Sequence, residues 1–86
     1  MNQLQTNQIK KLIKNLSDDD LKQAAREVLV WFNTFEMDSN SHFSNIAEEI
    51  VRITDCGDYI KFRMAENGIL EEATRRYVEQ KKEVDI

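Results

Sequence analysis

The sequence predicts an all-α protein, a compact single-domain bundle of about four to five helices. The 86 residues include no proline and only two glycines, so few positions would interrupt a helix. Apolar residues recur at intervals of three and four in successive segments, which is the period of an amphipathic helix. The length suits one domain, residues 1–86, whose ends near 1–5 and 81–86 are expected to fray.

The first predicted helix covers about Thr6 to Leu16 and has an apolar face and a basic face. The apolar face contains Ile9, Leu12, Ile13 and Leu16, and the basic face contains Lys10, Lys11 and Lys14. A basic amphipathic helix can lie on an anionic membrane. Here the apolar anchors are few and the remaining chain is acidic, so we expect this face to pack against the next helix instead.

The segment from Ser17 to Met37 predicts a long helix that forms the main wall of the core. Ser17 can accept hydrogen bonds from the free amides of the first turn, and the acids Asp18–Asp20 complement the positive end of the helix dipole. The apolar residues of one broad side are Leu21, Ala24, Ala25, Val28, Leu29, Trp31, Phe32 and Phe35. Val30 and Met37 fall on the polar side, which makes them candidates for contact with a partner.

A polar turn at Asp38–Ser41 separates this helix from a third one. Asn45, with Glu48 three positions later, predicts a capping box at the start of the third helix. Its apolar stripe contains Ile46, Ile50 and Ile53. Gly57 then permits the left-handed turn that closes the helix.

Two further helices complete the prediction. Asp58 is expected to cap a short fourth helix, and Gly68 is expected to end it before a fifth helix that reaches Tyr77. The apolar residues of the fourth helix are Tyr59, Ile60, Phe62 and Met64. Because these residues do not share one narrow stripe, the helix must be central, or must offer one side to a partner or to a second copy of the chain. A homo-oligomer is therefore one of the predicted assemblies.

The charge balance disfavours nucleic acid as a partner. The chain has 12 lysines and arginines against 16 acids, and the net charge of −4 opposes approach to a phosphate backbone. A helix-turn-helix remains open for the segment from Tyr59 to Tyr77, with its tight turn at Asn67 and Gly68 and two exposed arginines on the second helix. Two glutamates precede those arginines, so a DNA-binding regulator is kept only as an alternative.

The sequence predicts no enzyme, no cofactor and no metal site. His42 is the only histidine and Cys56 the only cysteine, and a Cys–His pair would lack a clear orienting group. A zinc site needs about four good ligands, and the acids Asp18–Asp20 fan out around a helix instead of converging on a cation. One cysteine allows no intramolecular disulfide, and no apolar run is long enough to span a bilayer. We therefore expect a cytoplasmic protein without direct membrane insertion.

Three segments carry a resemblance to a known family: the Asn- and Lys-rich start from Met1 to Leu16, the apolar block from Val28 to Phe35, and the polar connection from Asp38 to Phe43. Over its whole length the chain resembles the accessory cytoplasmic antiholins of T-even phages. The resemblance implies a non-enzymatic lysis-inhibition protein that binds the cytoplasmic segment of a phage holin and delays hole formation and host lysis. It also implies a location in the host cytoplasm, with recruitment to the inner membrane through the holin.

Six residues are the candidate contacts with such a partner: Val30, Met37, His42, Phe43, Tyr59 and Phe62. They are chosen because they leave the apolar stripes or lie beside the exposed connection between the second and third helices. Aromatic and aliphatic anchors ringed by polar groups commonly dominate binding energy. No family motif assigns any of the six residues to a role.

A second class of function stays open. A small acidic phage protein could inhibit a host enzyme or defence complex by presenting its acids to a basic patch. The acids that would do so are Asp18, Asp19, Asp20, Glu48 and Glu49. Such binding would weaken strongly with salt, whereas an apolar contact with a holin would depend on residues such as Val30 or Phe43.

Overall fold

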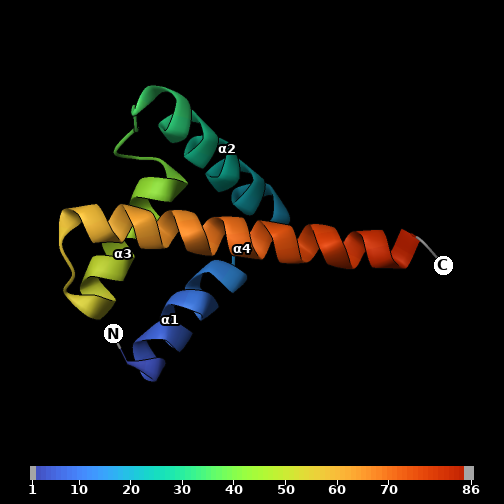
Figure 1. Ribbon diagram of the computed structural model, residues 1–86, viewed down its shortest axis with the longest axis horizontal. Helices are drawn as coiled ribbons and strands as arrows, with labels where there is room; N and C mark the ends of the chain where they lie inside the picture. The colour runs from blue at the N-terminus through green and yellow to red at the C-terminus, as the bar shows by residue number, and fades with distance from the viewer. Residues whose placement is uncertain (1, 85–86) are drawn as a thin grey trace.

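Four helices form the protein (Figure 1). The computed structural model describes residues 2–84, with side chains as far as residue 80. Its helices are α1 (Gln3–Lys14), α2 (Asp18–Thr34), α3 (His42–Thr54) and α4 (Asp58–Val84), and no strand occurs in this described part. The predicted all-α, single-domain bundle is confirmed. Fraying near 1–5 and 81–86 stays a prediction, and residues 1, 85 and 86 lie outside the described part.

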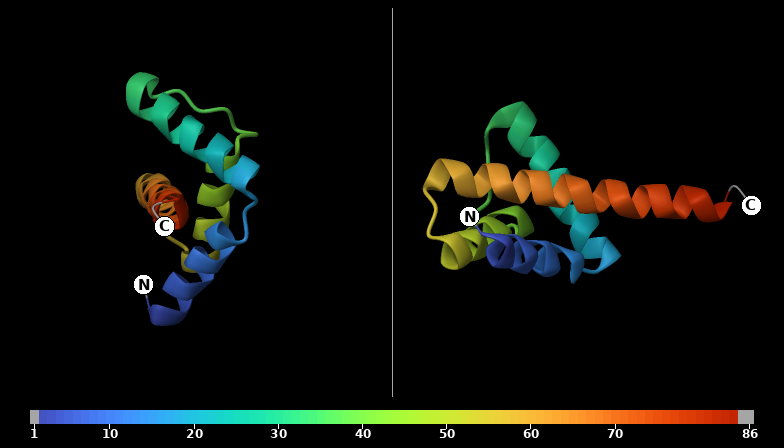
Figure 2. Two further views of the ribbon diagram at one scale, coloured as in Figure 1. Left: turned by 90° about the vertical axis from the view of Figure 1, so that its right-hand side faces the viewer. Right: turned by 60° about the horizontal axis from the view of Figure 1, so that its bottom comes forward.

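The longest helix, α4, has 27 residues and packs against the three others. Helix α3 crosses it, while α1 and α2 lie to either side of the crossing (Figure 1). Viewed along α4, the helices α1, α3 and α2 form an arc that covers one side of α4 and leaves its opposite side uncovered (Figure 2). The bundle is consequently flat, with principal extents of 45 × 33 × 17 Å.

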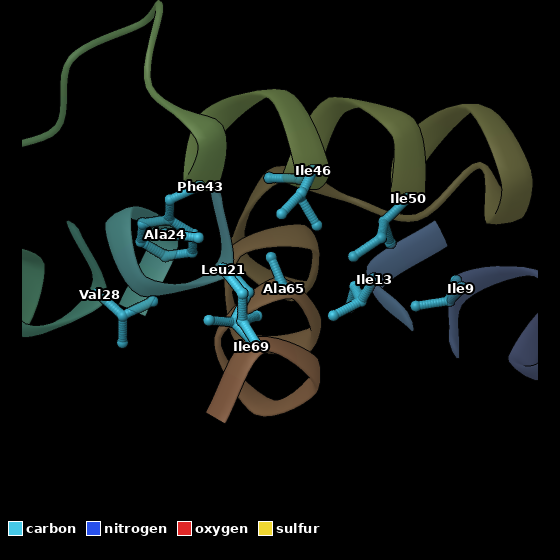
Figure 3. Packing of buried hydrophobic residues seen from close by; sticks show 11 residues of the cluster. Ile9, Ile13, Leu21, Ala24, Val28, Phe43, Ile46, Ile50, Ala65 and Ile69 are labelled. Atoms are coloured by element: carbon cyan, nitrogen blue, oxygen red, sulfur yellow. The ribbon is translucent and has the colours of Figure 1, made fainter. Parts of the chain in front are cut away.

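One contiguous core lies between the arc and α4 (Figure 3). All four helices contribute buried apolar side chains to it. These residues are Ile9, Ile13, Leu21, Ala24, Val28, Phe43, Ile46, Ala47, Ile50, Ala65 and Ile69. The contribution of α3 is the densest, because its isoleucines at positions 46 and 50 share a face with Phe43 and that face meets both α4 and the flanking helices.

Polar side chains begin the first three helices. Asn2 and Gln5 form a capping box on α1, and the Ser17 hydroxyl accepts from the Asp20 amide at 3.1 Å, as predicted for α2. The predicted start of α3 at Asn45 is wrong. Ser41 caps this helix instead, because its hydroxyl already accepts from the Ser44 amide at 3.1 Å.

Left-handed residues close α2 and α3, but neither is a glycine. Phe35 follows α2 with φ 56°, and Asp55 follows α3 with φ 55°. The predicted left-handed turn at Gly57 is therefore wrong, because Asp55 makes that turn two residues earlier. Helix α2 also ends at Thr34, so Met37 lies in the connection after the helix.

The predicted break at Gly68 is wrong as well, because α4 runs unbroken through this residue. Gly68 lies where α1 crosses α4. A Cβ atom added there would stand 2.4 Å from Cδ1 of Ile13, so the glycine makes room for a buried isoleucine. No helix-turn-helix forms between Tyr59 and Tyr77, and the DNA-binding alternative loses its structural basis.

A polar cluster ties the end of α1 and the start of α2 to α4. Arg76 donates to the carbonyls of Lys14 and Leu16 at 3.1 and 2.8 Å, and to the Asp18 carboxylate at 2.8 Å. Its Nε donates to the buried Glu72 carboxylate at 2.7 Å. These bonds satisfy carbonyls at the C-terminal end of α1 that no helical amide can reach.

Removing the δ-methyl group of Ile13 should make room for an alanine at position 68. In an Ile13→Val background, Gly68→Ala should raise the free energy of unfolding by about 1 kcal/mol, the usual gain in a helix interior. In the wild-type background the same change should stabilise less or destabilise, because the new methyl group meets Cδ1 of Ile13. Denaturant unfolding of the four variants measures this coupling. An equal effect in both backgrounds would contradict the proposed contact.

Glu72 should contribute stability that is lost in acid. Hydrogen bonds from Arg75 and Arg76 lower the pKa of Glu72 from 4.5 to about 2, against the opposing effect of burial. Because the folded pKa lies below the unfolded value, the contribution is complete above pH 4.5 and disappears as the pH falls toward 2. The stability difference between the wild type and Glu72→Gln should shrink over this interval in urea unfolding. A difference independent of pH would refute this role for Glu72.

Candidate functional site

The most exposed apolar surface lies between the end of α2 and the start of α4. We call it the aromatic cleft. It is lined by Trp31, Phe32 and Phe35 from α2 and its C-cap, by Tyr59 and Phe62 from α4, and by the charged residues Asp58, Arg63 and Glu66. The cleft forms because the last turns of α2 stand away from α4 (Figure 1), so side chains between the two helices are only partly covered.

Trp31 is the centre of the cleft. Its ring lies 5.9 Å from the ring of Phe35, nearly perpendicular to it, and 5.7 Å from the ring of Phe62. Phe43 lies beneath, 6.3 Å from Trp31 and 5.9 Å from Phe62. Edge-to-face and tilted contacts at these separations are favourable. The floor of the cleft is therefore held in place by the core.

The walls of the cleft are much more exposed than its floor. Phe35 and Tyr59 each expose 75% of their surface, and Phe32 exposes 53%. Soluble proteins rarely leave contiguous apolar surface of this kind uncovered unless something binds there. The positions of these three rings thus make the cleft the best candidate for a binding surface.

The backbone at Phe35 is also unusual. Its φ of 56° and ψ of 24° lie in the left-handed region, which asparagine and glycine adopt readily and a bulky residue adopts at a cost of about 1–3 kcal/mol. Stability alone would favour a smaller residue at this helix end. Strained backbone conformations of this kind cluster at binding and active sites.

Charged groups border the cleft without filling it. Asp58 pairs with Lys61 at 3.2 Å, and an Arg63 guanidinium nitrogen donates to the Tyr59 hydroxyl at 3.3 Å. Arg63 thereby steadies the exposed tyrosine ring at the edge of the site. An apolar interior with a polar edge is the arrangement expected of a surface that recognises an apolar segment of another protein.

Two of the six candidate residues, Tyr59 and Phe62, lie in the aromatic cleft. Val30, Met37 and His42 lie together around a second, more polar hollow beside the connection from α2 to α3. Nε2 of His42 lies 3.7 Å from the Asp20 carboxylate there. The structure thus separates these five candidates into two surfaces.

The sixth candidate, Phe43, is completely buried. The prediction that it contacts a partner conflicts with this position. Its backbone amide donates to Glu27 of α2 at 3.0 Å, and its ring packs under the aromatic cleft. Helix α3 begins at His42, so Phe43 lies in its first turn. There the side chain of Phe43 points into the core.

The predicted core positions of Phe32 and Phe35 are wrong, because both side chains are exposed, whereas Trp31 is half-buried and packs against the core. Only Leu21, Ala24 and Val28 of the predicted broad side are fully buried. One signal was present in the sequence: residues 28–32 are all apolar. Consecutive helical residues point to all sides, so some of these side chains must be exposed or covered by a partner.

The only histidine and the only cysteine of the chain lie far apart. His42 begins α3 and Cys56 follows its end, roughly 20 Å away along the helix. Among the described residues, no group of three or more histidine, cysteine or acidic side chains could hold a metal ion. None of the described helices has the length and apolarity needed to cross a bilayer.

A groove between α1 and α4 is the other apolar hollow of note. Its floor contains Ile9, Ile13 and Met64. Its walls are charged, and some of these charges pair with one another, as Lys10 does with Glu71 at 3.9 Å. Because large exposed apolar rings are concentrated at the aromatic cleft, the cleft is the stronger candidate site.

Phe43 and Phe35 should respond oppositely to substitution. Phe43→Ala should lower the free energy of unfolding by about 3–5 kcal/mol, because it leaves a cavity under Trp31. Phe35→Asn should stay within about 1 kcal/mol of the wild type, since relief of the left-handed strain offsets the lost ring contact. Thermal and urea unfolding of the two variants measure this difference in the free energy of unfolding. Equal destabilisation would mean that Phe35 is a core residue.

Compared with known proteins, the sequence matches no family model, and no curated protein or solved structure matches it.

Proposed function

We propose that this chain is a cytoplasmic antiholin. It binds the cytoplasmic segment of a phage holin, in the host cytoplasm and at the inner membrane surface, and delays hole formation and host lysis. The aromatic cleft is the observation that carries the proposal, and the resemblance over the whole chain names the partner.

Three properties of the cleft support binding to an apolar segment of another protein. Its rings are exposed, its floor is fixed by Phe43, and Phe35 is held in a strained conformation that points to selection for something other than stability. Aromatic anchors in such a setting typically dominate binding energy. An amphipathic helix laid into a groove is a common way to fill a surface of this kind.

Inhibition would proceed by occupancy. Holins must cluster in the membrane before they open a lesion. A protein that binds the unclustered holin shifts the assembly equilibrium toward the bound, inactive form by mass action. The delay should consequently depend on the concentration of the chain relative to its dissociation constant. No catalytic group is needed for this mechanism.

The acidic-inhibitor alternative has less support from the geometry. Several of the acids that would have to meet a basic patch already bind cations of the same chain. Asp18 pairs with Arg76 at 2.8 Å, Glu48 with Lys61 at 2.6 Å, and Glu49 with Arg52 at 3.2 Å. A partner would have to compete with these pairs, which lowers the gain from binding.

Phe35→Asn should weaken holin binding without unfolding the protein. The change keeps the left-handed backbone and removes one of the two most exposed rings of the cleft. A peptide with the sequence of the holin cytoplasmic segment should lose affinity by about tenfold or more. Trp31 is the only tryptophan and lies inside the cleft, so its fluorescence reports binding at this surface directly. In cells, lysis should begin earlier with the variant than with the wild type.

Leu4→Asn is the matched control, because Leu4 is an exposed apolar residue of α1 outside the cleft. It should leave affinity and lysis timing unchanged. An equal loss in both variants would argue against the cleft as the binding surface.

A pull-down from nuclease-treated infected cells in mild detergent tests the partner itself. Recovery of a soluble host enzyme and no holin would reject the antiholin assignment. Binding that weakens steeply with salt would favour the acidic inhibitor.

A further inference from the structure

The uncovered side of α4 carries a second stripe of exposed apolar residues. Since α1, α3 and α2 pack on one side of this helix (Figure 2), its opposite side faces away from the whole bundle. Ile60 exposes 50% of its surface there, Tyr77 60% and Val78 56%. Helix α4 has the lowest amphipathicity of the four helices because apolar residues lie on this outer side as well as in the core.

The outer residues follow a seven-residue repeat. Ile60, Asn67 and Thr74 are spaced by seven, and so are Arg63, Leu70 and Tyr77, of which Leu70 is half-buried and also packs against the core. The two series alternate at intervals of three and four, which is the pattern of the seam in a two-helix coiled coil. We call these six residues the outer stripe. Its length, roughly 26 Å from Ile60 to Tyr77, is long enough to hold a partner helix over several turns.

The arrangement of the outer stripe is nearly symmetric about its midpoint. Tyr59 and Ile60 lie at one end, Tyr77 and Val78 lie at the other, and the polar Asn67 lies near the centre. A second helix running in the opposite direction would place Ile60 against Tyr77 at both ends of the pair, with Tyr59 and Val78 flanking that contact on opposite sides. Such a two-fold contact uses the same residues on both copies.

We infer that a second copy of this chain packs antiparallel on α4 through the outer stripe. The inference does not rest on the proposed function, although the outer stripe shares Arg63 with the edge of the aromatic cleft. The apolar ends provide the buried contact. Near the two-fold axis, the Asn67 residues of the two copies are offset by about 4.5 Å along the helices. Their amides can therefore bond to each other, as polar residues in such seams do to fix the register.

Charge favours the antiparallel direction over the parallel one. In a parallel pair the seam would place Arg63 against Arg63, and Glu66 would flank Glu71 of the other copy. Both contacts join like charges. In the antiparallel pair Arg63 faces Thr74, and Glu66 lies beside Ala73. A second copy therefore avoids like-charge contacts along the stripe when its α4 runs antiparallel to the first.

Ile60→Glu should disrupt this dimer. The change occurs twice in a two-fold interface, so the dimer dissociation constant should rise by about tenfold or more. Sedimentation velocity over a concentration series should show a dimer for the wild type and a monomer for the variant, with unchanged helix content by circular dichroism. Leu29→Glu is the control, because Leu29 is an exposed aliphatic residue of α2 outside the stripe. A wild type that is monomeric at every concentration would overturn the inference.

Cross-linking tests the direction of pairing. In a Cys56→Ser background, Ile60→Cys and Tyr77→Cys chains are mixed and treated with a short bismaleimide. Antiparallel packing predicts products between positions 60 and 77 in the mixture, and little product in either variant alone, because identical positions lie about 25 Å apart. Products between identical positions would reject the antiparallel arrangement. The cleft variant Phe35→Asn should still dimerise, so loss of holin binding and loss of dimer formation are separable results.

Discussion

The unbroken course of α4 through Gly68 is the constraint on which the other features of the structure depend. A side chain at this position would collide with Ile13, and a helix break would separate the core residues Ala65 and Ile69 from each other. Because α4 stays continuous, the other three helices can pack against one side of it and share one core. A protein this small has little apolar surface to bury, so a single long wall is an efficient solution.

Polar bonds then fix the helices that the core alone would leave free to slide. Arg76 of α4 reaches the last carbonyls of α1 and the first turn of α2, and Glu72 holds Arg76 from the same helix. Lys61 joins α4 to Glu48 of α3 in a similar way. Hydrogen bonds to charged groups are directional and stronger than neutral ones, so these links set the positions of helices whose apolar contacts are less specific.

Three helices pack on one side of a fourth. As a consequence, two apolar surfaces of the protein stay exposed. The last turns of α2 stand away from α4 and form the aromatic cleft, and the far side of α4 carries the outer stripe. The two surfaces meet at Arg63, which belongs to both. A partner in the cleft and a second copy on the stripe would therefore be neighbours, and binding of one would be sensitive to the other.

The sequence by itself determined the helical class, the Ser17 cap of α2 and most of the apolar faces, because these follow from local periodicity and from side chains adjacent in the chain. Ser17 and the isoleucines of α3 are examples. Only the tertiary structure decided that Gly68 lies inside a helix, that Asp55 makes the left-handed turn, and that Phe43 is buried while Phe35 is exposed. Each of these depends on which helix covers which face. Local periodicity shows that a face is apolar, and it does not show how far along the helix a neighbour covers it.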